Sequence, residues 1–507
     1  MKKLLLMLVA VTATMTTFAN TEDEGWQKSF TPVANKADLD GVHTAVAADG
    51  SVYASSTYNQ AFQFAGKAVT DPDGLLSSCI VKYDVEGNEK WAISLLGACK
   101  IYAMTADTDG TLYVAGQSQD SKVTCTGTDS NTKTIEGSLT DYVVFVAKIS
   151  KDGVFEAVKT IQSAVNATIE ESSMYFPEPG DIYVRPTNIR IDANKVLVSV
   201  NYTGDVAELS WSGRYLNVFD FMYQDNKAAG VFMVDKADLS NITSVANLGA
   251  TEIVSYIQYY PDALNFTMYE GKPFVVFVGF GDLTLTTPAG SQQFNFETSD
   301  DESGNKEHAF VFVDATNPTA PKIFHAAKHD KETRPYNFVC GDIVNGNCYI
   351  GGTFYGNFPL DNSVTKDNNT SFVASIKMSD CSVNWAVANE VESEAKCMVV
   401  TGEEIHASTA DALYVLKTAN GELKGTEDKG FEDADSYNDQ YVSTVSTDDN
   451  NVIVFCPKMN PSGINETKAL KNAAAKIYNL NGVELSAPQK GLNIIKTTDG
   501  VKKVTVK

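Results

Sequence analysis

The chain has 507 residues, with 40 Lys and Arg against 64 Asp and Glu, so its formal net charge is −24. That length corresponds to two to four ordinary domains or to one large domain built from repeats. Hydrophobic residues make up 43% and aromatic residues 10% of the chain, which is enough for a sizeable core and excludes global disorder. Because the acidic excess repels phosphate backbones and anionic lipids, it argues against binding to nucleic acid or to a membrane surface.

The first nineteen residues have the three parts of a secretory signal. Lys2 and Lys3 form the charged start, residues 4–11 are apolar, and Thr17 and Ala19 offer small residues before a cleavage site. The apolar run is far shorter than the ~20 residues needed to cross a bilayer. We therefore expect residues 1–19 to be a signal peptide. The mature protein is expected in the periplasm, on the outer cell surface or secreted, without a transmembrane segment.

Export permits disulfides, and the number of cysteines is even. No CxxC pair occurs, which argues against a zinc ribbon or a thioredoxin-type motif. Two pairings, Cys381–Cys397 and Cys79–Cys99, are plausible because each closes a short loop. The alternative is that cysteines serve as small buried apolar residues. The eight cysteines are Cys79, Cys99, Cys125, Cys340, Cys348, Cys381, Cys397 and Cys456.

Internal repetition organises most of the chain. Each half of the repeat reads as strand, tight turn, strand, with Val, Ile, Phe and Tyr at strand positions and Asp-Gly, Glu-Gly or Asn-Gly at many of the reversals. Two such hairpins per unit give four antiparallel strands. One half occurs at 43–58, 103–118, 189–204, 267–282 and 342–356, and the other at 79–95, 144–161, 230–248, 309–326 and 371–388, with a shorter copy at 412–424.

The spacing of the repeats predicts an all-β fold, a β-propeller of four-stranded antiparallel blades. Units that begin near residues 42, 101, 187, 262, 337, 396 and 440 give seven blades, the last one incomplete; six blades is the alternative. Residues 24–32 resemble a fourth strand without its predecessors, and residues 440–456 supply a first and a second strand. Joining the two ends of the segment 24–456 would close the ring and remove its exposed edges.

Two repeat copies carry a family resemblance. ADTDGTLYVAGQ at 106–117 and CIVKYDVEGNEKWAISL at 79–95 resemble the bacterial β-propeller repeat family of exported and surface proteins, of the type found in Bacteroidetes. The segments 202–209 and 354–360 are similar to that family's short extension after the second strand. The resemblance implies the propeller fold and little about function, since the family is not tied to one activity.

The C-terminal segment 463–507 carries a second resemblance. Its residues 477–482 (IYNLNG), 490–494 (KGLNI) and Val/Lys-rich end are similar to the C-terminal tails of exported Bacteroidetes proteins. In type IX secretion substrates a related module acts as the export and attachment signal. The resemblance therefore implies a sorting tail. The alternative is a structural appendage, either a small β module or the third strand of the closing blade.

The expected blade geometry places the candidate binding surface. Turns between strands one and two and between strands three and four are short, whereas the other connections are long, as at 59–78, 118–141, 162–186, 205–229 and 282–307. Long loops on a rigid scaffold are where binding usually resides. Aromatic side chains in these loops could stack on sugar rings or form a protein-binding patch, or could be buried by an inserted hairpin. The candidates are Trp211, Tyr215, Phe219, Tyr223, Tyr256, Tyr259 and Tyr260.

Signals for catalysis are weaker. A glycosidase needs two carboxylates that face each other across a bond, and no such pair stands out. Asp107, Asp109 and Gly110 resemble half a calcium loop but lack the later Glu ligand, so the segment reads as a turn. We expect no cofactor and no metal site.

The sequence thus favours an exported, non-enzymatic propeller that binds a glycan or a protein at the cell surface. The alternatives are a polysaccharide hydrolase or lyase with carboxylates at its channel, and a purely structural cell-surface protein.

Overall fold

The structure is a computed structural model. Apart from the short 3-10 helix η1 (Ala207–Leu209), the elements of the described residues are all β-strands, which confirms the expected all-β class. The described residues are 25–32, 41–70, 76–137, 142–163, 184–213, 216–217, 223–224, 228–250, 263–279, 281–296, 309–325, 336–427, 430–437, 441–448, 451–456, 476–478, 484–485, 491–497 and 500–506.

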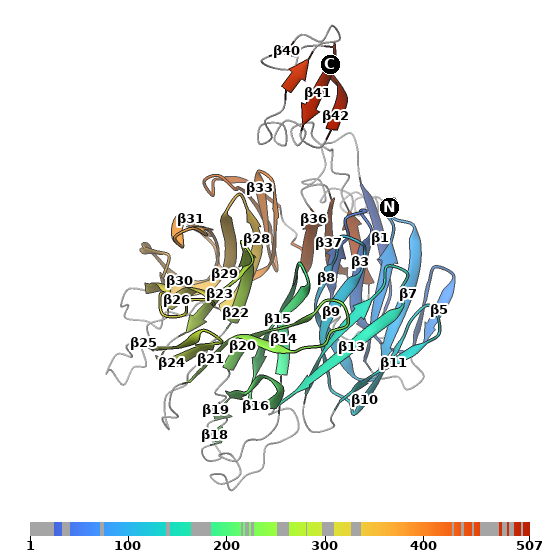
Figure 1. The fold of residues 1–507 in the computed structure, drawn as a ribbon, viewed down its shortest axis with the longest axis horizontal. Coiled ribbons are helices and arrows are strands. Elements are labelled where there is room, and N and C mark those ends of the chain that lie inside the picture. Colours follow the sequence, from blue (N-terminus) through green and yellow to red (C-terminus); the bar gives the residue numbers. More distant parts are fainter. Residues whose placement is uncertain are drawn as a thin grey trace, which may run out of the picture. The chain divides into compact units, whose positions relative to one another are not determined.

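Seven four-stranded antiparallel blades make up the body of the protein (Figure 1), so the expected seven-bladed propeller is confirmed. The alternation of small and branched apolar residues along the strands suits a pleated surface that is buried on both faces. From first to fourth strand, blade 1 consists of β2 (His43–Val46), β3 (Val52–Tyr58), β6 (Ser77–Tyr83) and β7 (Glu89–Leu96), and blade 2 of β8 (Cys99–Ala106), β9 (Leu112–Ser118), β12 (Val143–Ile149) and β13 (Phe155–Gln162). Blade 3 consists of β14 (Val184–Asp192), β15 (Lys195–Tyr202), β20 (Ala228–Asp235) and β21 (Thr243–Ala250), and blade 4 of β22 (Ala263–Tyr269), β23 (Lys272–Gly279), β26 (Ala309–Asp314) and β27 (Lys322–His325).

The remaining three blades follow the same order. The first strands of all seven blades contact one another in a closed ring, β2–β8–β14–β22–β28–β32–β36 and back to β2, so they surround the axis. Blade 5 consists of β28 (Tyr336–Val344), β29 (Asn347–Phe358), β30 (Asp361–Lys377) and β31 (Ser382–Ala388), and blade 6 of β32 (Ala395–Thr401), β33 (Glu404–Thr409), β34 (Leu413–Lys417) and β35 (Leu423–Glu427). Blade 7 consists of β36 (Asp433–Tyr437), β37 (Tyr441–Asp448), β38 (Asn451–Cys456) and, as its fourth strand, β1 (Trp26–Phe30).

The N-terminal strand closes the ring. β1 pairs antiparallel with β38 from Trp26 opposite Cys456 to Phe30 opposite Val452, as the fourth strand of blade 7. The assignment of residues 440–456 to the first and second strands is wrong, because β37 and β38 are the second and third strands. The first strand, β36, has the sequence DADSY and lacks a hydrophobic strand pattern because two of its aspartates bind a neighbouring strand.

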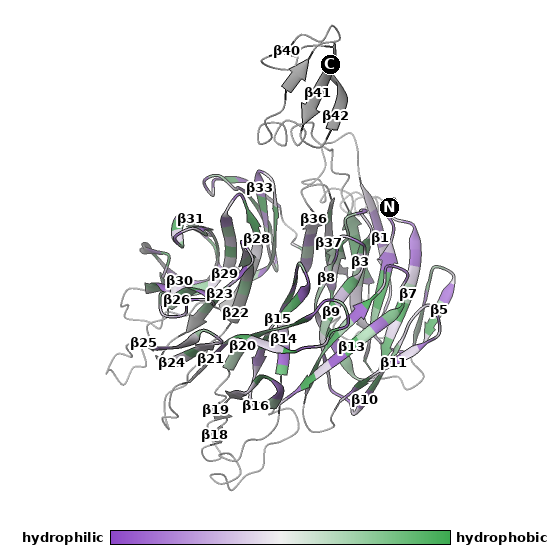
Figure 2. Ribbon diagram, in the orientation of Figure 1, coloured by the Kyte–Doolittle hydropathy of each residue, from purple (hydrophilic) through white to green (hydrophobic). Residues whose placement is uncertain are grey.

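Packing between blades provides the core. Buried apolar residues form seven clusters, and each cluster joins side chains of two adjacent blades. The cluster between blades 1 and 2, for example, contains Ile80 and Trp91 from blade 1 and Val114 and Phe145 from blade 2. Figure 2 shows hydrophobic residues along the middle strands of the blades and more hydrophilic ones on β1. Each blade is therefore stabilised by its neighbours rather than by a core of its own.

Inserted segments cover five of these seams. In each of blades 1 to 5 the chain between the second and third strands packs into the cluster that the blade shares with the preceding one, as Val123 and Cys125 do for blade 2. The hairpin of blade 2 pairs with β7 of blade 1, and that of blade 4 pairs with β21 of blade 3. These segments contain β4 (Ala61–Phe64), β5 (Lys67–Thr70), β10 (Lys122–Thr126), β11 (Thr132–Glu136), β16 (Gly204–Val206), β17 (Trp211–Gly213), β18 (Leu216–Asn217), β19 (Tyr223–Gln224), β24 (Gly281–Thr287), β25 (Gly290–Phe296) and, in blade 5, the extended hairpin β29–β30.

A tryptophan contact recurs at three seams. The Trp91 indole on the fourth strand of blade 1 donates a hydrogen bond of 3.0 Å to the Lys151 carbonyl in a turn of blade 2. A Cβ atom on Gly153 in that turn would come within 3.0 Å of the indole ring, and this glycine has a φ of +83°. Only glycine fits both demands without strain. Trp385 and Trp26 repeat the contact, with the carbonyls of Thr418 and Val85.

A second compact unit follows the propeller. Contacts divide the chain into residues 1–457 and residues 458–507. The second unit contains one sheet in the order β40–β39–β41–β42. Since β38 is the third strand of blade 7, the alternative that the tail supplies that strand is wrong. The strands of this unit are β39 (Lys476–Tyr478), β40 (Glu484–Leu485), β41 (Gly491–Thr497) and β42 (Gly500–Val506).

Candidate functional site

A cavity of about 260 Å³ lies at the centre of the ring of first strands. Six of the seven first strands line it, namely β2, β8, β14, β28, β32 and β36. Because each strand contributes only two to five residues, the lining is assembled from segments far apart in the sequence. Polar and charged side chains dominate it: His43, Thr44, Tyr102, Thr105, Thr187, Asn188, Arg190, Lys396, Glu432, Asp433, Asp435 and Ser436.

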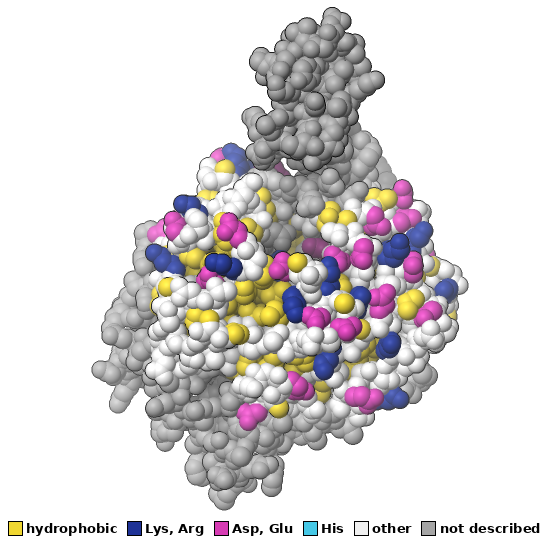
Figure 3. Space-filling model, in the orientation of Figure 1, with side chains coloured by type: hydrophobic (Ala, Val, Ile, Leu, Met, Phe, Trp, Pro, Cys, Tyr) yellow, Lys and Arg dark blue, Asp and Glu magenta, His cyan; other side chains and the backbone are white. Residues whose placement is uncertain are grey.

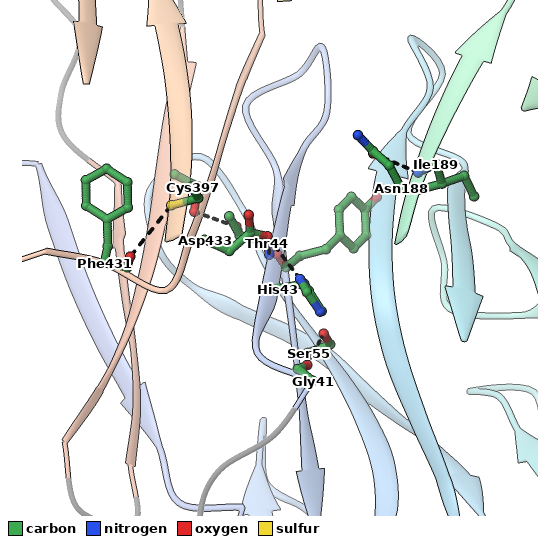
Figure 4. Close-up of polar contacts among 11 residues, drawn as sticks. Gly41, His43, Thr44, Ser55, Asn188, Ile189, Cys397, Phe431 and Asp433 are labelled. Atoms are coloured by element: carbon green, nitrogen blue, oxygen red, sulfur yellow. Dashed lines mark hydrogen bonds and ion pairs between the residues drawn. The ribbon is translucent and has the colours of Figure 1, made fainter. Parts of the chain in front are cut away.

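Two aspartates of blade 7 hold the edge of blade 1 within this cavity. The Asp433 carboxylate accepts a 3.0 Å hydrogen bond from the Thr44 backbone N–H and lies 3.4 Å from His43 Nδ1 (Figure 4). The Asp435 carboxylate accepts a 2.8 Å bond from the Val46 N–H. The inner edge of β2 has no further strand to pair with, so these carboxylates satisfy N–H groups that would otherwise need water.

Several other polar groups of the lining also have partners. Lys396 on β32 forms a 3.1 Å ion pair with Glu432, the residue just before β36. On β14, the Asn188 side-chain oxygen accepts a 2.7 Å hydrogen bond from the Ile189 N–H, and the hydroxyl groups of Thr187 and Ser199 are 2.7 Å apart. The cavity wall is therefore a fixed hydrogen-bonded surface rather than a set of loose side chains.

A second cavity adjoins the first at the end where the short turns lie. Its volume is about 450 Å³, and it shares Thr105 and Arg190 with the central cavity. Lys236, in the turn after β20, pairs with the Asp107 carboxylate at 2.7 Å and forms part of this wall. Arg190 thus lines both cavities, so a ligand that occupies both would lie beside it. The sequence instead favoured the opposite, long-loop face.

The half calcium loop is a turn, as its sequence suggested. The Asp109 carboxylate accepts a 2.8 Å hydrogen bond from the Thr111 N–H, which lowers the pKa of that carboxyl below its ordinary value. Asp107 accepts a bond from the Thr108 N–H in addition to its pair with Lys236. Within the described part of the chain, no group of three or more His, Cys, Asp or Glu side chains is placed to hold a metal ion.

Trp211, the first of the aromatic candidates, is a core residue. Only 4% of its surface is exposed, its ring stacks on Tyr202 with centroids 5.4 Å apart, and its Nε1 donates to the Ser244 hydroxyl at 2.8 Å. For Trp211 the alternative of burial by an inserted hairpin therefore holds: the residue is not a surface binding group but fills the seam between blades 2 and 3. Tyr215, Phe219, Tyr256, Tyr259 and Tyr260, as well as the side chain of Tyr223 on β19, lie outside the described part of the structure.

Neither expected disulfide is formed in the structure. Cys79, Cys99, Cys381 and Cys397 are buried thiols, and the members of each pair lie in different core clusters. Short sequence spacing proved misleading here because the members of each pair belong to successive blades and face different seams.

The cavity residues were missed from the sequence. They belong to six different repeats, and no linear motif connects them. The one available signal was a break in the repeat pattern: β36 is a strand of polar residues in an otherwise hydrophobic repeat.

Figure 3 shows acidic and basic side chains interspersed over blades 1 and 2, so the net negative charge is not gathered on that face.

The architecture defines the class as a seven-bladed β-propeller, and the resemblance to a propeller repeat family is confirmed as to fold. No protein-family model and no curated protein matches the chain. Among solved structures, it is similar to BamB from Moraxella catarrhalis (10% identity, 83% of this chain and 99% of that one, TM-score 0.39). It is likewise similar to Sqt1 from Saccharomyces cerevisiae (9% identity, 85% and 99%, TM-score 0.40) and to the designed protein Ika8 (9%, 84% and 99%, TM-score 0.39).

In the part of the chain that the structure describes, no helix has the length and apolar character needed to cross a membrane.

Proposed function

We propose that this protein is an exported, non-enzymatic binding protein that holds the end of a glycan in its central cavity. The observation that carries the proposal is the polar lining that six blades build around the axis. Hydroxyl, amide, guanidinium and carboxylate groups occur there together and supply both donors and acceptors, a combination that suits a ligand rich in hydroxyl groups. Tyr102 adds one aromatic ring to the wall, and such rings pack on the apolar faces of sugars.

The size of the cavity favours a small ligand. The central space of about 260 Å³ and the adjoining space of about 450 Å³ admit a few sugar residues and exclude a folded protein surface. A glycan that occupies both cavities would lie beside Arg190, with Thr187 and Asn188 of the same strand in the central one.

The carboxylates argue against hydrolysis. A glycosidase needs one carboxyl group to donate a proton and a second to attack or to activate water. Asp433 and Asp435 accept hydrogen bonds from the backbone of β2, and Glu432 pairs with Lys396. Because these groups hold the ring together, binding without cleavage is the expected outcome.

The test is a glycan array probed with the mature chain, followed by titration of the glycans that bind. We expect Arg190→Ala to weaken binding about tenfold, the value that corresponds to the loss of about 1.4 kcal/mol of contact energy. Arg185 lies on the same strand, β14, is exposed and lines neither cavity, so Arg185→Ala is the matched control and should bind as the parent does.

Three results would count against the proposal. Equal weakening by both substitutions would indicate a general electrostatic effect instead of a cavity site. Shortened products from a bound polysaccharide would replace the binding protein with a hydrolase or lyase. If the mature chain bound no glycan but captured a protein at the cell surface, the protein-binding alternative would take its place.

Export is tested separately. We expect the mature protein to begin at Asn20, directly after the small residues that end the signal segment. Intact-mass measurement of the protein recovered from the periplasm, cell surface and medium gives both ends of the chain. A form that has lost residues 463–507 would favour the sorting role of the tail, whereas retention of Met1 in a cytoplasmic protein would contradict export.

A further inference from the structure

The hairpin β10–β11 crosses from one blade to the next. It leaves blade 2 between β9 and β12, yet β10 pairs with β7, the fourth strand of blade 1, with Cys125 opposite Leu95. Val123, Cys125 and Ile135 of this hairpin enter the apolar cluster between the two blades. The hairpin thus joins two blades, although its register is fixed by only three paired positions on β7.

Two cysteines meet around one residue of this seam. Cys99, at the start of blade 2, directs its Sγ to the Leu95 carbonyl oxygen, 3.5 Å away. Cys125 lies directly across the sheet from the same Leu95. The two segments are also close at Gly97 and Val123, which lie two positions before Cys99 and Cys125. A Cβ atom on Gly97 would lie 3.2 Å from the Val123 side chain. Both thiols are buried in the same cluster.

We propose that Cys99 and Cys125 form a disulfide that fastens the inserted hairpin of blade 2 to the seam with blade 1. The oxidant is a second disulfide, such as oxidised glutathione or a disulfide-exchange enzyme. One cysteine thiolate attacks that disulfide and releases one thiol. The other cysteine, after losing its proton, attacks the mixed disulfide and releases the second thiol. Two protein thiols are oxidised and one external disulfide is reduced to two thiols.

The cross-link forms before the seam closes. Burial, and to a smaller extent the neighbouring Cys99 sulfur, raises the pKa of the Cys125 thiol well above its ordinary value. A buried, protonated thiol is a poor nucleophile, so the folded and reduced protein resists oxidation. Oxidation therefore belongs to folding in an oxidising compartment, when β10 has not yet covered the cluster.

Other cysteine pairs lack this placement. Cys79 and Cys456 share one core cluster, and Cys348 and Cys381 share another. In neither pair is there one residue that is the cross-strand partner of one cysteine and is contacted by the sulfur of the other, as Leu95 is for Cys125 and Cys99. Among the described cysteines, Cys99 and Cys125 are thus the pair that a sulfur contact and the strand register bring to the same residue, Leu95.

Peptide mapping distinguishes the proposed link from its rivals. The mature chain is unfolded, refolded in a glutathione buffer, blocked with N-ethylmaleimide and digested with trypsin without reduction. Lysines at 90, 100, 122 and 133 place Cys99 in peptide 91–100 and Cys125 in peptide 123–133. We expect these two peptides joined, with a mass lower by two hydrogens than their sum. The oxidised protein should also melt roughly a few degrees higher than after unfolding and refolding under reduction.

Serine variants provide the controls. Cys125→Ser should abolish both the linked peptide and the difference in melting temperature, whereas Cys348→Ser in a distant seam should keep both. Recovery of both peptides as blocked thiols would overturn the proposal, and so would peptide 91–100 joined to peptide 68–82, which contains Cys79. The same digest of exported protein, never unfolded, decides the matter if refolding fails.

Discussion

Replacement of Trp91 by alanine is expected to lower the free energy of unfolding by about 3–5 kcal/mol, the usual cost of removing a large buried aromatic side chain. Trp91 is 6% exposed, its ring lies 5.8 Å from that of Tyr53, and its Nε1 donates to the Lys151 carbonyl of the next blade. The substitution opens a cavity in the seam between blades 1 and 2. Equilibrium unfolding in urea, followed by tryptophan fluorescence and circular dichroism, measures the loss.

Trp91→Phe separates packing from hydrogen bonding. Phenylalanine keeps much of the apolar volume and removes the indole N–H, so we expect a smaller loss, about 1–2 kcal/mol. The Lys151 carbonyl stays satisfied in this variant, because Lys82 Nζ also donates to it at 2.9 Å. If the phenylalanine variant were as unstable as the alanine variant, the contact would act through its hydrogen bond and not through the seam it fills.

The same contact explains part of the repeat pattern. The sequence predicts the glycines of the Glu-Gly, Asp-Gly and Asn-Gly turns from hairpin geometry alone. In the structure Gly87, Gly153 and Gly421 have a second role, because each receives the indole ring of the preceding blade. That role joins residues tens of positions apart, so a single hairpin contains no sign of it. The pairing between Trp and the following Gly becomes visible only once the blades are stacked.

Strand content, blade count and ring closure could be predicted because they depend on local patterns that repeat seven times. The first strand of blade 7 could not, since its sequence DADSY follows the needs of the cavity instead of the repeat. The use of the long connections was also hidden. The sequence leaves Trp211 either exposed for binding or buried by an inserted hairpin, and the structure shows that it is buried and seals the seam with the preceding blade. Composition does not distinguish an exposed aromatic loop from an inserted plug.

The second large effect concerns the closing strand. A mature chain that starts at residue 33 lacks β1 and leaves β38 as an exposed edge next to hydrophobic seams. Phe30 is buried between blades 7 and 1, and the Trp26 ring lies 5.3 Å from that of Tyr83 in blade 1. Removing both rings and the strand pairing costs several kcal/mol, which is comparable to the ~5–15 kcal/mol that stabilises most folded proteins. We expect aggregation or loss of the cooperative unfolding transition.

A peptide of residues 24–32 tests whether the loss is specific. Added to the shortened chain during refolding, it should restore a single melting transition, because an open sheet edge accepts a strand of matching register. Substitutions within the full chain grade the effect. Phe30→Ala should destabilise by about 3–5 kcal/mol, whereas Lys28→Ala, at an exposed position of the same strand, should change stability by less than about 0.5 kcal/mol. A shortened chain that melts like the parent would show that blades 7 and 1 hold together without β1, and ring closure would then rest on Asp433 and Asp435 at the inner edge.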